Sequence, residues 1–62
     1  MKKYQVLNQL NTVLLDGVTL GEASQYAFNY MKMYPDFTFQ NGKFYSGKKH
    51  KKNLRLKIEE QS

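Results

Sequence analysis

The apolar residues near the start of the chain are spaced as on one face of a helix. They stand at positions i, i+3, i+6 and i+10, and polar residues fill the other side. These residues are Tyr4, Leu7, Leu10 and Leu14. We predict a helix here, ended at Asp16-Gly17 because glycine tolerates positive φ. The alternative is a pair of short strands, residues 4–7 and 12–15, joined by a turn.

A second helix is predicted after Gly17. Thr19 and Glu22 have the spacing of a capping box, in which each side chain binds the other residue's backbone N–H. Apolar residues then recur on one helical stripe as far as Met31. Pro35 disfavours helical geometry at the residue before it, so we predict that the helix ends at about Met33.

Residues 37–46 carry the pattern of a β-hairpin. Asn41-Gly42 is the preferred pair for a two-residue type I′ turn, and β-forming residues flank it. The implied register places Phe39 opposite Phe44, with Phe37 on the same face. Thr38 and Tyr45 then lie on the other face.

Strict alternation of apolar and charged residues from Leu54 to Ile58 predicts a third strand, paired with the second strand of the hairpin. The predicted fold is therefore α+β, with two N-terminal helices followed by a β-hairpin and a third strand. We expect one small domain, residues 1–62, with a basic loop at 47–52 and a C-terminal tail, 59–62, that can fray.

Length and composition narrow the function classes. The chain has 62 residues, no Cys and a single His, so neither a disulfide nor a thiolate metal site is expected. So short a chain barely makes a core, and we expect no enzyme, cofactor or metal. The three acidic residues before position 46 have structural explanations as a helix stop, a cap and a turn. They are Asp16, Glu22 and Asp36.

The chain has no apolar stretch of the roughly 20 residues that cross a membrane, and polar residues follow its N-terminus instead of a signal-peptide core. We therefore expect a cytoplasmic protein with no membrane partner.

The net charge of +5 is concentrated near the C-terminus, where residues 47–62 hold six Lys and Arg against two Glu. Four lysines in the loop repel one another, which predicts a polyanionic partner such as nucleic acid. The alternative is a solvated loop that aids solubility. The predicted phosphate-binding residues are Lys48, Lys49, Lys51 and Lys52, supported by Arg55, Lys57 and Lys43.

Eight Tyr and Phe residues lie between positions 26 and 45. Most are expected in the core, since a chain without Trp or Cys needs large apolar side chains. Tyr45, on the hairpin face away from the three Phe residues, is the candidate for stacking on a base. Met31 and Met33 either fill the core or contact a partner.

Residues Val18–Tyr26 resemble the first helix of excisionase and MerR-like winged-helix proteins, in which a Thr-capped helix opens a helix-turn-helix and a hairpin wing follows. The resemblance implies binding to double-stranded DNA, an origin in a phage or mobile element, and a location in the cytoplasm of a bacterial host. It makes Lys32, Asn29 and Gln25 candidates for base contact.

The sequence therefore predicts a DNA-binding regulator or recombination accessory factor that acts as a homodimer or a cooperative assembly. Two alternatives stay open. One is a phage-encoded modulator or inhibitor that binds a host protein through its aromatic and Met surface. The other is a binder of single-stranded nucleic acid.

Overall fold

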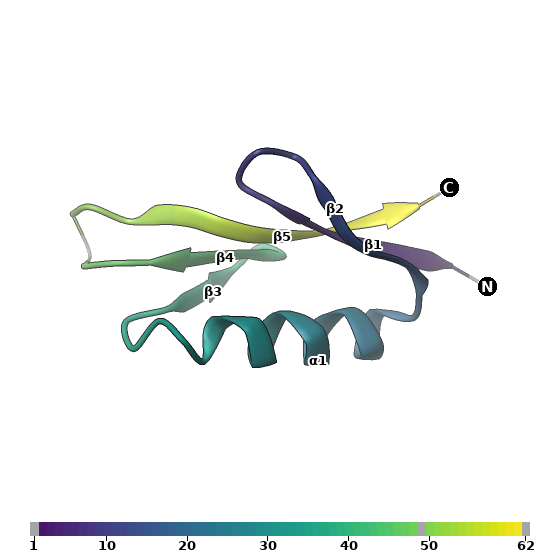
Figure 1. Cartoon of the computed structure of the whole chain (residues 1–62), viewed down its shortest axis with the longest axis horizontal. Coiled ribbons are helices and arrows are strands. Elements are labelled where there is room, and N and C mark those ends of the chain that lie inside the picture. The colour runs from purple at the N-terminus through teal and green to yellow at the C-terminus, as the bar shows by residue number, and fades with distance from the viewer. Residues whose placement is uncertain (1, 49, 62) are drawn as a thin grey trace.

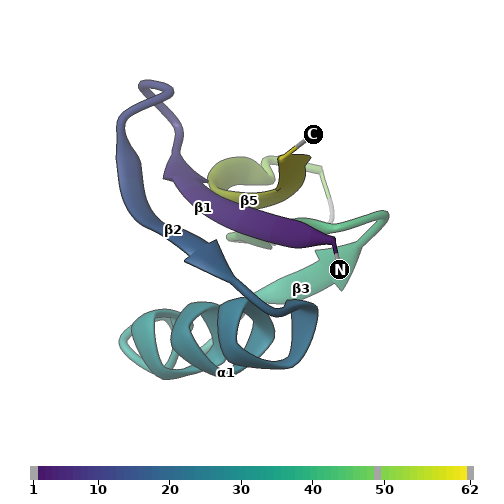
Figure 2. The same ribbon diagram turned by 90° about the vertical axis from the view of Figure 1, so that its right-hand side faces the viewer.

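The computed structural model describes residues 2–48 and 50–61, and in it one helix packs on one face of a five-stranded antiparallel sheet (Figures 1 and 2). The strand order is β2-β1-β5-β4-β3. In chain order the elements are β1 (Lys3–Asn8), β2 (Val13–Val18), α1 (Leu20–Met31), β3 (Thr38–Gln40), β4 (Lys43–Ser46) and β5 (Asn53–Gln61).

The predicted N-terminal helix is wrong, and the alternative of two strands is the structure found. Val6 and Leu7 are consecutive, and both are buried. Adjacent side chains of a strand point to opposite faces, so both can be buried on a sheet. The connecting turn is closed by Asn8, whose Oδ1 accepts hydrogen bonds from the backbone N–H of Leu10 at 2.9 Å and of Thr12 at 3.0 Å. Gly17 is no helix stop; it lies within β2.

The second predicted helix is confirmed as α1. The capping box is present, with Thr19 Oγ1 accepting from the Glu22 N–H and Glu22 Oε1 accepting from the Thr19 N–H, both at 3.2 Å. Ala23, Ala27 and Met31 are fully buried, so the small alanine side chains let the helix approach the sheet closely. The helix ends at Met31, two residues before the predicted end.

We expect Thr19→Ala to lower the free energy of unfolding by about 1 kcal/mol, because it removes the hydroxyl that accepts from the Glu22 N–H. Urea denaturation followed by circular dichroism measures the change. Thr19→Ser keeps a hydroxyl and is expected to stay close to the wild type. Equal midpoints for Thr19→Ala and the wild type would contradict the role of the cap.

The predicted hairpin is confirmed as β3 and β4. Asn41 and Gly42 have φ values of 53° and 74°, as a type I′ turn requires. The register is the predicted one, with Phe39 opposite Phe44 and Thr38 opposite Tyr45.

The third predicted strand is confirmed as β5 and pairs with β4, but it is longer than the alternating segment suggests. Its C-terminal part pairs with β1, from Leu56 opposite Asn8 to Gln61 opposite Lys3. Residues 59–61 of the C-terminal tail belong to this strand, and residue 62 lies outside the described residues.

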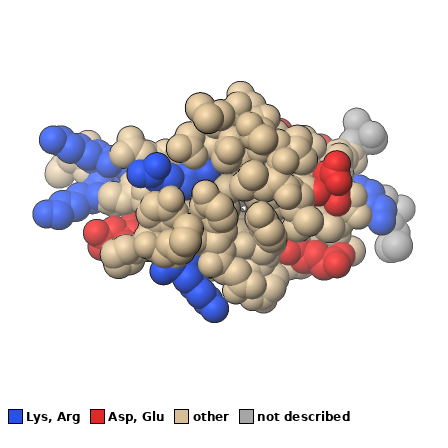
Figure 3. All heavy atoms as spheres, viewed as in Figure 1, with Lys and Arg blue, Asp and Glu red and all other residues tan. Residues whose placement is uncertain are grey.

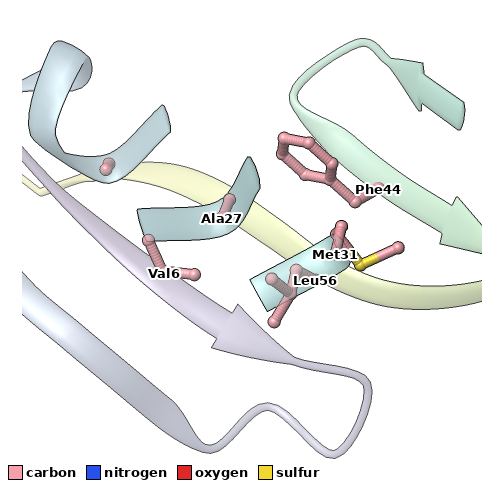
Figure 4. Close-up of a cluster of buried hydrophobic side chains, with 6 residues drawn as sticks. Val6, Ala27, Met31, Phe44 and Leu56 are labelled. Atoms are coloured by element: carbon pink, nitrogen blue, oxygen red, sulfur yellow. The ribbon is translucent and has the colours of Figure 1, made fainter. Parts of the chain in front are cut away.

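The core lies between α1 and the central strands (Figure 4). The fully buried side chains are Val6, Ala23, Ala27, Met31, Phe44 and Leu56. Because Phe44 and Leu56 pair across β4 and β5 and both belong to this core, their sheet neighbours Lys43 and Lys57 face away from α1. We call the sheet face away from α1 the open face.

The predicted winged-helix-like fold, with two N-terminal helices, is thus corrected to a mostly β fold. Among the residues that the structure describes, α1 is the only helix, so they contain no helix-turn-helix. Residues 32–37, where a recognition helix would begin, form a turn that leads directly into β3.

Candidate nucleic-acid interface

The sheet narrows to two strands at the turn between β4 and β5. The last β1–β5 pair is Asn8 with Leu56, and the last β3–β4 pair is Thr38 with Tyr45. Beyond these pairs only β4 and β5 continue, joined through Ser46 and Asn53. We call residues 45–48 and 50–54 the prong. Figure 1 shows it at the end of the long axis of the molecule, beyond the end of α1.

Lysines occupy the turn of the prong. Lys48, Lys51 and Lys52 are all exposed, and the N–H of Lys51 donates to the carbonyl oxygen of Lys48 at 2.8 Å. Gly47 enters the turn with φ at +101°, a conformation that side chains rarely adopt. The predicted phosphate ligand Lys49 lies outside the described residues. The structure thus brings three of the four loop lysines together on one exposed turn.

Two further predicted cations lie side by side on the open face. Lys43 of β4 is directly opposite Lys57 of β5, and like charges in that position destabilise a sheet. Leu7, only 6% exposed, pairs with Lys57 from the other side. The two lysine side chains therefore leave the sheet from opposite positions on this face, where an anion between them offsets part of their repulsion.

Tyr45, the stacking candidate, lies in the prong on the same open face. It is half-buried and pairs with Thr38 and Leu54. The predicted face is confirmed, but Tyr45 is the only aromatic residue of the described strands β3, β4 and β5 on that face. One half-buried ring is a weaker platform for stacked bases than the series of rings that single-strand binders use.

Arg55, also predicted to support phosphate binding, has a different environment. Its Nε donates to Ser46 Oγ at 2.7 Å, and its guanidinium carbon lies 5.1 Å from the centre of the Tyr34 ring. Tyr34 packs against the core, so Arg55 is on the α1 side of the prong and not on the open face. The sequence pattern did not predict this position of Arg55, because strict alternation places Arg55 on the same face of the sheet as Lys57.

The three candidates for base contact do not join the prong lysines. Gln25 and Asn29 are exposed on the side of α1 away from the sheet, where Gln25 Nε2 donates to Asn29 Oδ1 at 3.2 Å. Lys32 caps the C-terminal end of α1 and is exposed. Since α1 covers the face opposite the open face, these residues and the Lys43–Lys57 pair cannot contact the same segment of a ligand.

Basic and acidic side chains are unevenly distributed along the long axis. Figure 3 shows most of the visible Lys and Arg toward the prong end, with one acidic group beside them, and the other visible acidic groups toward the opposite end, with one basic group beside them. Glu59 and Glu60 close β5 there, and Glu22 lies in the first turn of α1. Among the described residues, the only ion pair joins Lys2 Nζ to Glu60 Oε2 at 3.8 Å. The prong lysines in residues 2–48 and 50–61 therefore have no carboxylate partner within ion-pair distance.

The aromatic and Met residues divide between core and surface. Met31 is fully buried as predicted, whereas Met33 is 67% exposed. Phe28 and Phe39 keep 40% and 48% of their surface exposed although their rings lie only 5.1 and 4.7 Å from that of Phe44. They form an apolar patch beside the edge strand β3, on the α1 side.

Over the described ranges, 2–48 and 50–61, the structure has neither a pocket nor a group of three residues suited to hold a metal. In the same residues α1 is too short to cross a membrane. No protein-family model, curated protein or solved structure was found to match the chain.

Proposed function

We propose that the protein binds double-stranded DNA by placing the prong in a groove. The observation that carries this proposal is a two-stranded ribbon that ends in a turn with three exposed lysines. The major groove, about 12 Å wide, admits a two-stranded β-ribbon. Beyond the last β3–β4 pair, the ribbon consists of the Ser46–Asn53 pair and the turn that follows it.

The basic residues take two roles in this proposal. Lys48, Lys51 and Lys52 neutralise phosphates along the groove in which the prong lies. Lys43 and Lys57 bind the adjacent backbone, and a phosphate between them relieves their mutual repulsion. Contacts of this kind supply affinity and position but do not read bases. We therefore propose modest sequence preference for one copy.

A weak, phosphate-based contact is strengthened when several copies bind together. We propose that the protein acts as a dimer or a cooperative array, as a phage or mobile-element regulator or recombination accessory factor in a bacterial cytoplasm. Arrays are compatible with the positions of Glu22, Glu59 and Glu60 at the other end of the molecule, because their carboxylates can face the prong lysines of a neighbouring copy.

We expect Lys51→Ala/Lys52→Ala to weaken binding to a short fluorescent duplex and to change its dependence on salt. Each lost phosphate contact lowers the slope of log K against log salt by about 0.9, so the double variant should lose about 1.8. Fluorescence anisotropy at several salt concentrations between about 50 and 200 mM measures the slope.

The matched control is Lys2→Ala/Lys3→Ala, which removes the same charge at the opposite end of the molecule. We expect its slope to stay within about 0.5 of the wild type, since these lysines are not in the interface. If the two double variants lose equal affinity, binding depends on net charge alone and the prong has no special role.

The apolar patch of Phe28 and Phe39 favours a second candidate function, binding to a protein partner. Both side chains are substantially exposed, and β3, the strand that contains Phe39, lies at the edge of the sheet. Binding at this patch removes apolar surface from water, so it would persist at a salt concentration that dissociates DNA from the lysines.

A further inference from the structure

Arg55 is set apart from the other cations by a β-bulge. Phe44 pairs with Leu56 and Tyr45 pairs with Leu54, so Arg55 is an extra residue of β5 with no partner on β4. A bulge interrupts the regular alternation of side chains and can redirect one of them. Here it turns Arg55 away from Lys57 and toward Tyr34.

Two contacts hold the plane of the guanidinium group. Nε donates to the hydroxyl of Ser46, which is itself 6% exposed, and the group lies over the ring of Tyr34. Arg55 is half-buried, unlike the exposed lysines of the turn. Its side chain is therefore held in one orientation instead of moving through solvent, so little conformational entropy remains to be lost when it binds a ligand.

The outer edge of this guanidinium group is unused. Nε is occupied by Ser46, but neither Nη atom has a hydrogen bond or a carboxylate partner among residues 2–48 and 50–61. Among the described residues, no buried side-chain nitrogen or oxygen lacks a hydrogen-bond partner, so the two Nη atoms reach solvent, where an anion can approach them. The two Nη groups present parallel N–H donors, the geometry that matches two oxygens of one phosphate.

We propose that Arg55, at the base of the prong, is a phosphate-recognition residue that binds one backbone phosphate through both Nη groups. The lysines of the neighbouring turn neutralise the phosphates on either side. The inference rests on the proposed DNA binding for the source of the phosphate. It goes beyond that proposal because it assigns a fixed, bidentate contact to one residue, where the lysines supply only charge.

Arg55→Lys tests this assignment because it keeps the charge and removes the fork. We expect the affinity for the duplex to fall about tenfold while the salt slope stays at the wild-type value. Ser46→Ala keeps Arg55 but removes the bond that orients it, and we expect a loss of about threefold. Thermal melts establish that each variant is folded. Wild-type affinity in both variants would overturn the proposal, even if the lysine variants behave as expected.

A second arm uses inorganic phosphate and follows the Nε–H signal of Arg55 by nuclear magnetic resonance. We expect a saturable shift of this signal in the wild type and a weaker response in Ser46→Ala. A signal that does not respond to phosphate would count against the site. If the duplex fails to bind but the Arg55 signal still titrates with phosphate, DNA binding is refuted and the phosphate site stands.

Discussion

Phe44→Ala is expected to leave the protein largely unfolded at room temperature. Phe44 is the largest fully buried side chain, and the rings of Phe28, Phe37 and Phe39 surround it at centroid distances from 4.7 to 6.5 Å. Truncating a buried Phe to Ala costs about 3–5 kcal/mol. A single core in so short a chain rarely supplies more than about 3–5 kcal/mol in total, so the loss matches the whole stability.

Far-UV circular dichroism and a urea titration measure this effect. The matched control is Phe39→Ala, the same chemical change at the cross-strand partner of Phe44, which is 48% exposed. We expect Phe39→Ala to remain folded and to lose less than half as much stability, because less apolar area returns to water. A cooperative transition at the wild-type midpoint in Phe44→Ala would show that the core does not depend on this ring.

Gly47→Ala is expected to have the second-largest effect, because it acts on both stability and binding. Gly47 has φ at +101°, and a Cβ atom there would lie 2.6 Å from the carbonyl oxygen of Lys51. Backbone atoms must move to relieve that contact, and the strained φ adds to the cost. We expect a loss of about 2–3 kcal/mol in the free energy of unfolding. The turn that presents the lysines must also change shape, so affinity for the duplex should fall.

Gly17→Ala is the matched control, because it adds a Cβ atom at a positive φ without a steric clash. Gly17 also has positive φ, at +65°, but a Cβ atom there would have nothing within 4 Å. We expect this variant to lose about 1 kcal/mol and to bind the duplex like the wild type. Equal changes in stability and affinity for the two glycine variants would mean that the turn of the prong tolerates an added side chain.

Signals confined to a few neighbouring residues predicted their elements well. The capping box of Thr19 and Glu22 and the Asn41-Gly42 turn depend on groups two to four residues apart, and both are present. Such interactions form within one segment, so they need no knowledge of the rest of the fold. The cross-strand pair of Phe39 with Phe44 followed from the turn alone.

The first residues were mispredicted because their partner is far away in the sequence. The period of the apolar residues fits a helix, but Tyr4 pairs with Glu60 and Val6 with Ile58. Those pairs join the two ends of the chain and fill the centre of the sheet. In the sheet, Val6 and Leu7 are buried on opposite faces, and β1 is hydrogen-bonded to a strand on each side. These interactions outweigh the helix preference of the segment, which is weak for a single short amphipathic stretch.

The sequence by itself determined α1, the hairpin, the strand that follows it and the concentration of lysines near the C-terminus, because each is encoded in adjacent residues. Only the tertiary structure decided that β1 lies between β2 and β5, and that Gln25 and Asn29 lie away from the prong. It also decided that Arg55 lies on the other face from Lys57, over the ring of Tyr34. These outcomes depend on strand pairing between segments that are distant in the sequence and on one β-bulge. Neither produces a periodic pattern of residues that could be recognised in the sequence.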